Sequence, residues 1–141
     1  MTNYDATNTN KSKRITKLYR DLDLDFGRNT VTSDVNVLED ADAVKRSVRN
    51  ILQTNHYERP FHPEMGSDLR NLLFENVNPL TAMSIKKKIL ECLSTYEPRA
   101  RIENLIIEPN PDTSTYGVEL YFYVKGIPTQ QKITSFLERL R

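Results

Sequence analysis

The chain has 141 residues, of which 38% are hydrophobic and 28% are charged, enough material for one domain with its own core. Its 20 Lys and Arg and 19 Asp and Glu give a formal net charge of +1, which excludes the chain-wide positive charge that non-specific nucleic-acid binding needs. No apolar run reaches the roughly eighteen residues of a membrane span, the first residues lack the apolar stretch of a signal peptide, and a single cysteine excludes an intrachain disulfide.

The N-terminal region changes from a polar segment to a strand-like one. We expect residues 1–14 to form a flexible arm, because Thr and Asn dominate there and no apolar periodicity appears. Residues 15–141 are then a single domain. Leucine and phenylalanine alternate with aspartate over 22–26, which predicts a strand with one wet face, and the valines of 31–37 predict a second, looser extended stretch.

A first helix is predicted from Asp40, a good N-cap residue, to about residue 53. Its apolar residues recur at steps of three and four and form one stripe: Ala41, Val44, Val48, Ile51 and Leu52. Prolines and a glycine then predict an irregular loop over 56–66, with Phe61 and Met65 as its apolar anchors. Ser67 is expected to cap a short helix over 68–75.

The second long helix is predicted to start at Asn78-Pro79, with Asn as N-cap and Pro at the first helical position. Pro98 ends it, because the residue before a proline disfavours helical geometry. One face of this helix is apolar, and its members are Ala82, Ile85, Ile89, Cys92, Leu93 and Tyr96.

The C-terminal part changes to period two. Residues 102–109 and 116–124 predict an antiparallel hairpin with a long loop. A helix is expected to restart at Pro128-Thr129, since four apolar residues fall at i, i+3, i+4 and i+7: Ile133, Phe136, Leu137 and Leu140. The predicted fold class is α+β, with a small antiparallel sheet (the C-terminal hairpin plus the N-terminal strand) packed against three main α-helices.

Residues that could bind a metal ion or react as a nucleophile are sparse. Two histidines share the loop with three acidic residues: His56, His62, Glu58, Glu64 and Asp68. This pattern is weak evidence for zinc, because it lacks cysteine and the helical three- or four-residue spacing, so we expect no metal and no cofactor. Cys92 lies on the apolar face of a helix and is interpreted as a core residue rather than a nucleophile.

Two further functions are weighed against plainer interpretations. Glu64, Glu75 and Glu97 are candidates for the paired carboxylates of a glycosidase, but Arg99 lies beside Glu97, and the chain has no Trp to line a sugar cleft. The basic residues of 11–20 could contact phosphate, but the acidic stretch that follows largely cancels them. We therefore expect no enzyme and no nucleic-acid partner.

The pattern favours contacts with other proteins. Glu97-Pro98-Arg99 places opposite charges two residues apart on a stiff kink, where both side chains point the same way and either engage another chain or fold back onto the helix. Glu119, Tyr121 and Tyr123 lie on the face of the last predicted strand that points away from Leu120 and Phe122. We expect the edge of this strand, over 118–125, to be open to strand addition, or else its aromatic residues to lie under the terminal helix.

Several strings in this order resemble a known family. Arg-Pro-Phe-x-Pro-Glu-x-Gly-x-Asp-Leu at 59–69, Leu-Phe-Glu at 73–75, Pro-Leu-Thr at 79–81 and Tyr-Glu-Pro-Arg at 96–99 are similar to the baseplate wedge proteins of contractile-tailed phages, the W protein family. Met65 departs from the Phe that the family usually has there. The family's loop motif corresponds to these residues of the chain: Arg59, Pro60, Phe61, Pro63, Glu64 and Gly66.

The resemblance implies a structural protein of the virion tail baseplate, assembled in the host cytoplasm. Its expected partners are other baseplate wedge proteins and the tail sheath protein, with six copies per baseplate, and neither nucleic acid nor membrane. Glu97-Pro98-Arg99 matches the motif by which the family contacts the helical wedge core. The hairpin and its flanking strand resemble the domain by which sheath subunits pair, which implies that the protein offers the first sheath ring its docking strands and templates that ring by strand addition. Two alternatives remain open: a lysozyme-like baseplate enzyme, and a binding module like a distant anti-adaptor relative.

Overall fold

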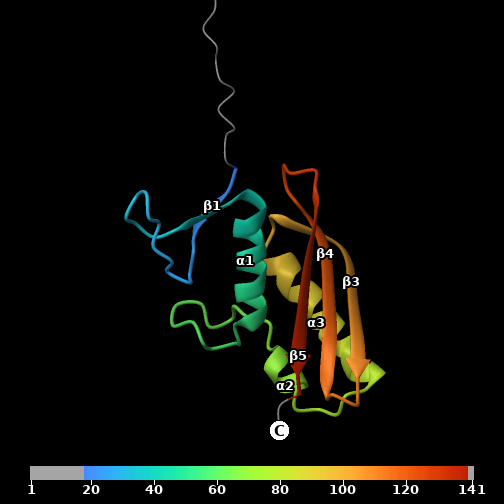
Figure 1. Ribbon diagram of the computed structural model, residues 1–141. Coiled ribbons are helices and arrows are strands. Elements are labelled where there is room, and N and C mark those ends of the chain that lie inside the picture. The colour runs from blue at the N-terminus through green and yellow to red at the C-terminus, as the bar shows by residue number, and fades with distance from the viewer. Residues whose placement is uncertain (1–17, 140–141) are drawn as a thin grey trace, which may run out of the picture.

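The computed structural model describes residues 18–139, so the N-terminal arm expected over 1–14 lies outside the described residues. These residues form three helices, a short two-stranded hairpin and a three-stranded sheet, arranged as in Figure 1. In chain order the elements are β1 (Arg20–Leu22), β2 (Val37–Glu39), α1 (Asp40–Gln53), α2 (Leu69–Leu72), α3 (Pro79–Tyr96), β3 (Ala100–Asn110), β4 (Thr115–Val124) and β5 (Gln130–Glu138). The α+β class is confirmed.

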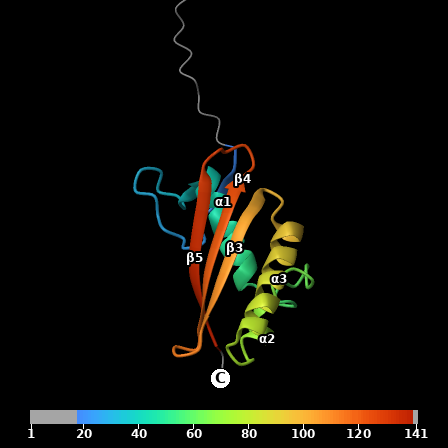
Figure 2. The same ribbon diagram turned by 90° about the vertical axis from the view of Figure 1, so that its right-hand side faces the viewer.

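The main sheet is antiparallel with the order β3-β4-β5, so β4 is its central strand. Alternate residues of β4 are buried, as period-two apolar residues require. This inward face packs on α1 and α3 to form the core, while the other face of the sheet is open (Figure 2). The largest buried side chains of the core are Tyr116, Phe122, Ile85, Ile89, Leu93, Leu105 and Leu120.

The predictions hold for the two long helices, α1 and α3, whereas the short helix α2 is limited to Leu69–Leu72 and is preceded by Asp68, not Ser67, as its N-cap residue. Val44, Val48 and Ile51 are buried on α1, as the apolar stripe predicts. Asn78 caps α3 as expected, since its side chain accepts a hydrogen bond of 2.8 Å from the Thr81 amide. Asp40 is not the cap of α1 but its first residue, and its carboxylate instead accepts hydrogen bonds from the Leu18 and Tyr19 amides.

The predicted terminal helix is wrong, because residues 130–138 form β5, which pairs with β4 along its length. The residues of β5 that point toward the core occupy alternate positions, as in a strand: Gln131, Ile133 and Leu137. The four-residue step from Ile133 to Leu137 fits a helix as well. The N-terminal strand predicted over 22–26 overlaps the observed β1 only at Leu22. It pairs with β2 in a separate sheet rather than with the C-terminal hairpin. None of the helices in residues 18–139 is both long and apolar enough to cross a membrane.

The β1–β2 hairpin, with its connecting residues 23–36, lies beside α1 on the side away from β3 (Figure 1). It is fixed by backbone hydrogen bonds from Asp23 to Asn36 and from Asn36 to Gly27, each 2.9 Å. Its apolar residues are largely solvent-exposed, which is unusual for so many in one segment. They are Leu22, Leu24, Phe26, Val31 and Val37.

Candidate functional site

The Glu97-Pro98-Arg99 kink lies where α3 ends and β3 begins. Its two charged side chains point the same way, as the extended spacing predicts, and they bind each other. Arg99 donates Nε–H to Glu97 Oε1 at 2.7 Å and Nη2–H to Oε2 at 2.9 Å, a bidentate pair. Glu97 is only 2% exposed, so the kink has folded back and its carboxylate is held inside the chain.

The charges around this pair keep both groups ionised. Burial alone raises the pKa of Glu97, but hydrogen bonds from Arg99 and Ser47 outweigh it and hold that pKa below its ordinary value. The hydrogen bonds from Arg99 to Glu97 raise the pKa of the guanidinium in turn. A carboxylate held ionised in this way does not serve as the general acid of a glycosidase, which needs a raised pKa.

Arg99 also connects the kink to the N-terminal hairpin. Its Nη1 lies 3.4 Å from Asp21 Oδ2 on β1, and its guanidinium carbon lies 5.4 Å from the centre of the Tyr19 ring. The Tyr19 hydroxyl donates to the Lys125 carbonyl at 3.1 Å, after β4. The kink therefore joins α3, β3, the hairpin and, through Ser47, α1.

The predicted edge site on β4 is corrected by the topology. β4 pairs with β3 on one side and β5 on the other, so the backbone over 118–125 offers no free edge; the free edges belong to β3 and β5. Tyr121 and Glu119 lie on the open face, as predicted, and no terminal helix covers them in the described residues. Lys132 of β5 donates to Glu119 at 2.8 Å and lies 5.2 Å from the Tyr121 ring.

The ends of the loop over 55–66 are joined by a backbone hydrogen bond. The Ser67 amide donates to the Thr54 carbonyl at 2.9 Å. Gly66 has a φ of 150°, and a Cβ there would lie 2.7 Å from the backbone of Thr54 and Asn55, so only glycine fits. Met65 packs against the core as predicted, but Phe61 does not anchor the loop, since it is 91% exposed.

The remaining loop residues have structural contacts. The Tyr96 hydroxyl donates to the Glu64 carbonyl at 2.7 Å, and His56 Nε2 lies 3.1 Å from the Gly66 carbonyl. His62 lies 3.3 Å from the Glu64 carboxylate, and no cluster of three or more metal-ligating side chains occurs in residues 18–139. Cys92 is buried, and burial raises its pKa to about 11, so the thiol stays protonated near neutral pH.

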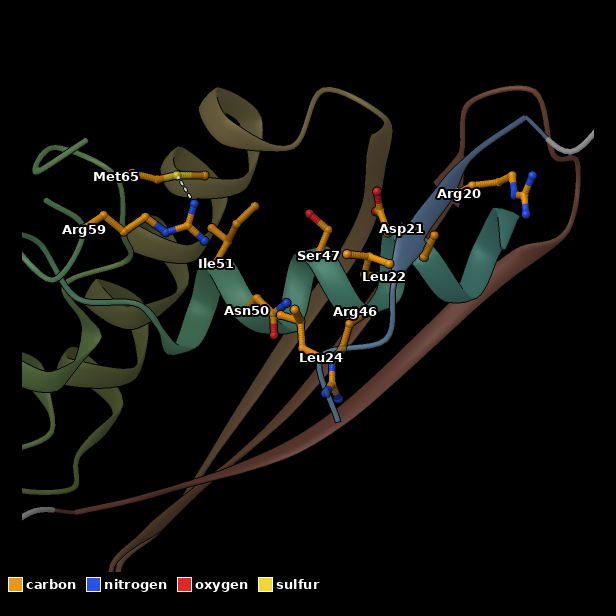
Figure 3. A pocket seen from close by; sticks show the side chains of 11 residues that line it. Arg20, Asp21, Leu22, Leu24, Arg46, Ser47, Asn50, Ile51, Arg59 and Met65 are labelled. Carbon is orange, nitrogen blue, oxygen red and sulfur yellow. Dashed lines mark hydrogen bonds between the residues drawn. The ribbon is translucent and has the colours of Figure 1, made fainter. Parts of the chain in front are cut away.

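A groove of about 470 Å³ runs along α1 between the hairpin and this loop (Figure 3). Arg20, Asp21, Leu22 and Leu24 form its hairpin side, and Arg59 and Met65 form its other end. Its floor on α1 is made by five residues: Ala43, Arg46, Ser47, Asn50 and Ile51. Sequence reasoning missed this groove because its walls come from segments about forty residues apart, although the exposed leucines of the DLDLD stretch were a signal.

The family model of baseplate wedge protein gp25 matches residues 38–131, two thirds of the chain. The chain belongs to this family. It is 38% identical over 116 residues to the baseplate wedge protein gp25 of Enterobacteria phage T4, covering 81% of this chain and 86% of that protein. The resemblance that the sequence motifs carry is thereby confirmed.

Two solved structures share the fold. One is a candidate tail lysozyme from Geobacter sulfurreducens, with a TM-score of 0.68 and 22% identity over 76% of this chain and 98% of that one. The other is a chain of the anti-feeding prophage baseplate, with a TM-score of 0.61, 18% identity and 87% of each chain covered. At these identities the likeness concerns the fold alone. Family membership makes this chain a structural component of a phage tail baseplate wedge, with other baseplate proteins as its partners.

Proposed function

We propose that this member of the gp25 family joins the wedge core at the Glu97-Pro98-Arg99 kink and gives the first ring of tail sheath subunits a strand edge on which to assemble. It works by binding alone, with neither metal nor cofactor, as one copy in each wedge and six in a baseplate. The anti-feeding prophage baseplate, which contains a chain of this fold, was symmetrised six-fold.

Arg99 is the partner-facing member of the kink. Its side chain is 29% exposed, whereas that of Glu97 is 2% exposed, so only the guanidinium is open to a carboxylate on another chain. Glu97 is a positioning residue, since its two hydrogen bonds fix the plane of the guanidinium. An arginine held in this way loses little side-chain entropy when a partner binds.

The observation that carries sheath assembly is the free edge of β5. This strand has nine residues, contains no proline and pairs on one side only, so its unpaired backbone groups can accept another strand. The β3 edge suits this role less well, because β3 has a register shift between Ile102 and Asn104, includes Pro109 and lies beside α3 (Figure 2). The strand edge that we propose for sheath binding is therefore that of β5, over 130–138, rather than the 118–125 region expected from the sequence.

Cysteine cross-linking in assembled tails tests the β5 edge. Thr134→Cys on β5 is expected to form a disulfide or maleimide cross-link with the sheath protein, while Met83→Cys, an exposed control on α3 next to β3, is expected to form none. The native Cys92 is buried and needs no replacement. Cross-linking at Met83→Cys alone would place the sheath at the other edge and refute the proposal.

Electron microscopy of tails assembled without this protein tests the sheath role as a whole. Baseplates that lack an ordered first sheath ring are the expected result, whereas complete contractile tails would contradict it. Arg99→Glu is expected to prevent incorporation into baseplates, and Arg101→Glu, a charge reversal two residues away on the open face, is the matched control.

A further inference from the structure

A small pocket opens between the free edge of β5 and α1, which lie side by side (Figure 1). Its volume is about 120 Å³, and most of its wall is aliphatic: Leu52, Leu69, Ile89, Val118, Ile133 and Leu137. A cavity of about 150 Å³ lined by such residues holds a benzene molecule. The β5 pocket therefore has room for one apolar side chain of the size of valine or leucine.

The pocket lies at a core-facing position of β5 that carries a small polar side chain. Ile133, Ser135 and Leu137 share the core side of the sheet, because each pairs with a buried residue of β4. Ile133 is buried and Leu137 is half-buried, whereas Ser135 between them is exposed and lines the pocket. The space that a larger residue would fill at position 135 is thus left open at the edge of the sheet.

Strand geometry decides which group can enter this space. A strand that pairs with the free edge of β5 lies about 4.8 Å away, and its side chains point to the same two faces as those of the residues opposite them. The residue opposite Ser135 then projects on the core side, between β5 and α1. Its side chain enters the pocket, while its neighbours in the strand project onto the open face, where Phe136 is 73% exposed.

The rim of the pocket restricts the chemistry of that side chain. Arg49 and Gln53 of α1 are exposed at the mouth of the pocket. The aliphatic stems of such long side chains can cover an apolar group that enters beneath them. A charged side chain would instead lose its hydration against the aliphatic wall. The pocket is therefore suited to an aliphatic residue.

We propose that the sheath strand that pairs with β5 inserts one aliphatic side chain, opposite Ser135, into this pocket, and that this side chain sets the register of the pairing. The inference rests on the proposed function, because it names the side chain by which β5 recognises that strand. A slip of one residue would turn the aliphatic side chain to the open face. A slip of two would place it against Ile133 or Leu137, which already fill their positions. Ser135 is thus the specificity-determining residue of the edge.

Photo-cross-linking in assembled tails tests this inference. p-Benzoylphenylalanine replaces Thr134, which is exposed on the open face of β5, and mass spectrometry identifies the sheath residue that it reaches. The neighbours of that residue in the sheath strand project to the core side, so at least one of them should be valine, isoleucine, leucine or methionine. Charged residues or glycine on both sides would overturn the pocket and retain the edge. A product within this chain, or no product with the sheath, would refute the edge and the pocket together.

Filling the pocket from within is the second test. Ser135→Leu is expected to lower the cross-link yield at position 134 at least tenfold, because the leucine occupies the space of the sheath side chain. Glu138→Leu, the matched control, adds the same side chain on the open face of β5 and should leave the yield unchanged. An unchanged yield with Ser135→Leu would refute the pocket and retain the edge.

A change in the sheath protein completes the test without altering this chain. Truncating the identified aliphatic residue of the sheath to alanine should lower the yield about as much as Ser135→Leu does, and combining the two changes should restore it. Because this sheath variant leaves the present chain intact, it decides the question even where Ser135→Leu unfolds in urea at lower concentration than the wild type. Full yield with the truncated sheath residue would overturn the inference.

Discussion

Removing Arg99 without removing Glu97 leaves an unpaired carboxylate in the core. In the Arg99→Met variant Glu97 keeps its buried position but loses both bonds to the guanidinium. Breaking a buried ion pair in this way costs about 3–5 kcal/mol. Since Arg99 is 29% exposed and Ser47 still reaches Glu97, we expect a loss of about 2–3 kcal/mol at neutral pH.

The sign of the pH dependence distinguishes this cause from lost packing. In the wild-type chain the lowered pKa of Glu97 means that its stabilisation is present above the ordinary carboxyl range and is lost as pH falls through the folded pKa. In Arg99→Met, burial prevails and raises the pKa of Glu97, so its protonated form stabilises the fold and stability is lost as pH rises. The destabilisation by the mutation should therefore be largest at neutral pH and shrink toward pH ~4.5.

Urea denaturation followed by circular dichroism at both pH values measures this difference. In thermal denaturation, the expected loss of free energy of unfolding corresponds to a fall in Tm of about 6–12 °C at neutral pH. Glu97→Gln combined with Arg99→Met should be more stable there than Arg99→Met alone, because the buried charge is gone. Arg101→Met, at a solvent-exposed position, controls for the loss of one arginine. An equal loss for Arg99→Met at the two pH values would refute the buried-charge reasoning.

Three further variants test the loop and the hairpin. Gly66→Ala should lose about 2–3 kcal/mol in urea denaturation, because its Cβ would lie 2.7 Å from backbone atoms. Phe61→Ala should change the free energy of unfolding by less than about 0.5 kcal/mol, since the ring is 91% exposed; a larger loss would show that it packs. Asp21→Asn weakens a half-exposed contact of 3.4 Å and should cost less than about 1 kcal/mol. Hydrogen exchange should nevertheless speed up at the Asn36 amide of the hairpin and stay unchanged in α3.

Local patterns were sufficient for the two long helices, α1 and α3, and for the hairpin of β3 and β4. Asn78-Pro79 carries a cap and a preset φ in two residues, so α3 begins where the sequence predicts. The strand β4 alternates over its full length and is buried at every second residue. Signals of this kind depend on neighbours within a few residues, which a single sequence displays.

The prediction failed where the deciding contact is distant in sequence. The spacing of Ile133 and Leu137 is compatible with a helix or a strand. The strand forms because it pairs with the edge of β4 that faces away from β3. Without this pairing, buried backbone groups of β4 would lack hydrogen-bond partners. The surroundings of the Glu97–Arg99 pair depend on Ser47, which contacts Glu97, and on Asp21, which contacts Arg99, and both lie about fifty or more residues earlier in the chain. The groove similarly needs the hairpin, α1 and the loop to be in place at once.

The ion pair explains how a small baseplate wedge protein can hold the end of α3 and the N-terminal hairpin in fixed positions. Arg99 bridges Glu97, at the end of α3, to Asp21, which lies in the wall of the groove. An apolar pair of the same volume would keep the core intact, since buried ion pairs contribute little net stability, but it would remove the contact between Arg99 and the hairpin and leave the Tyr19–Lys125 and Arg46–Asp25 contacts in place. The hairpin and the kink would then be joined by fewer contacts. Under the proposed function, the pair serves the geometry of assembly more than the stability of the fold.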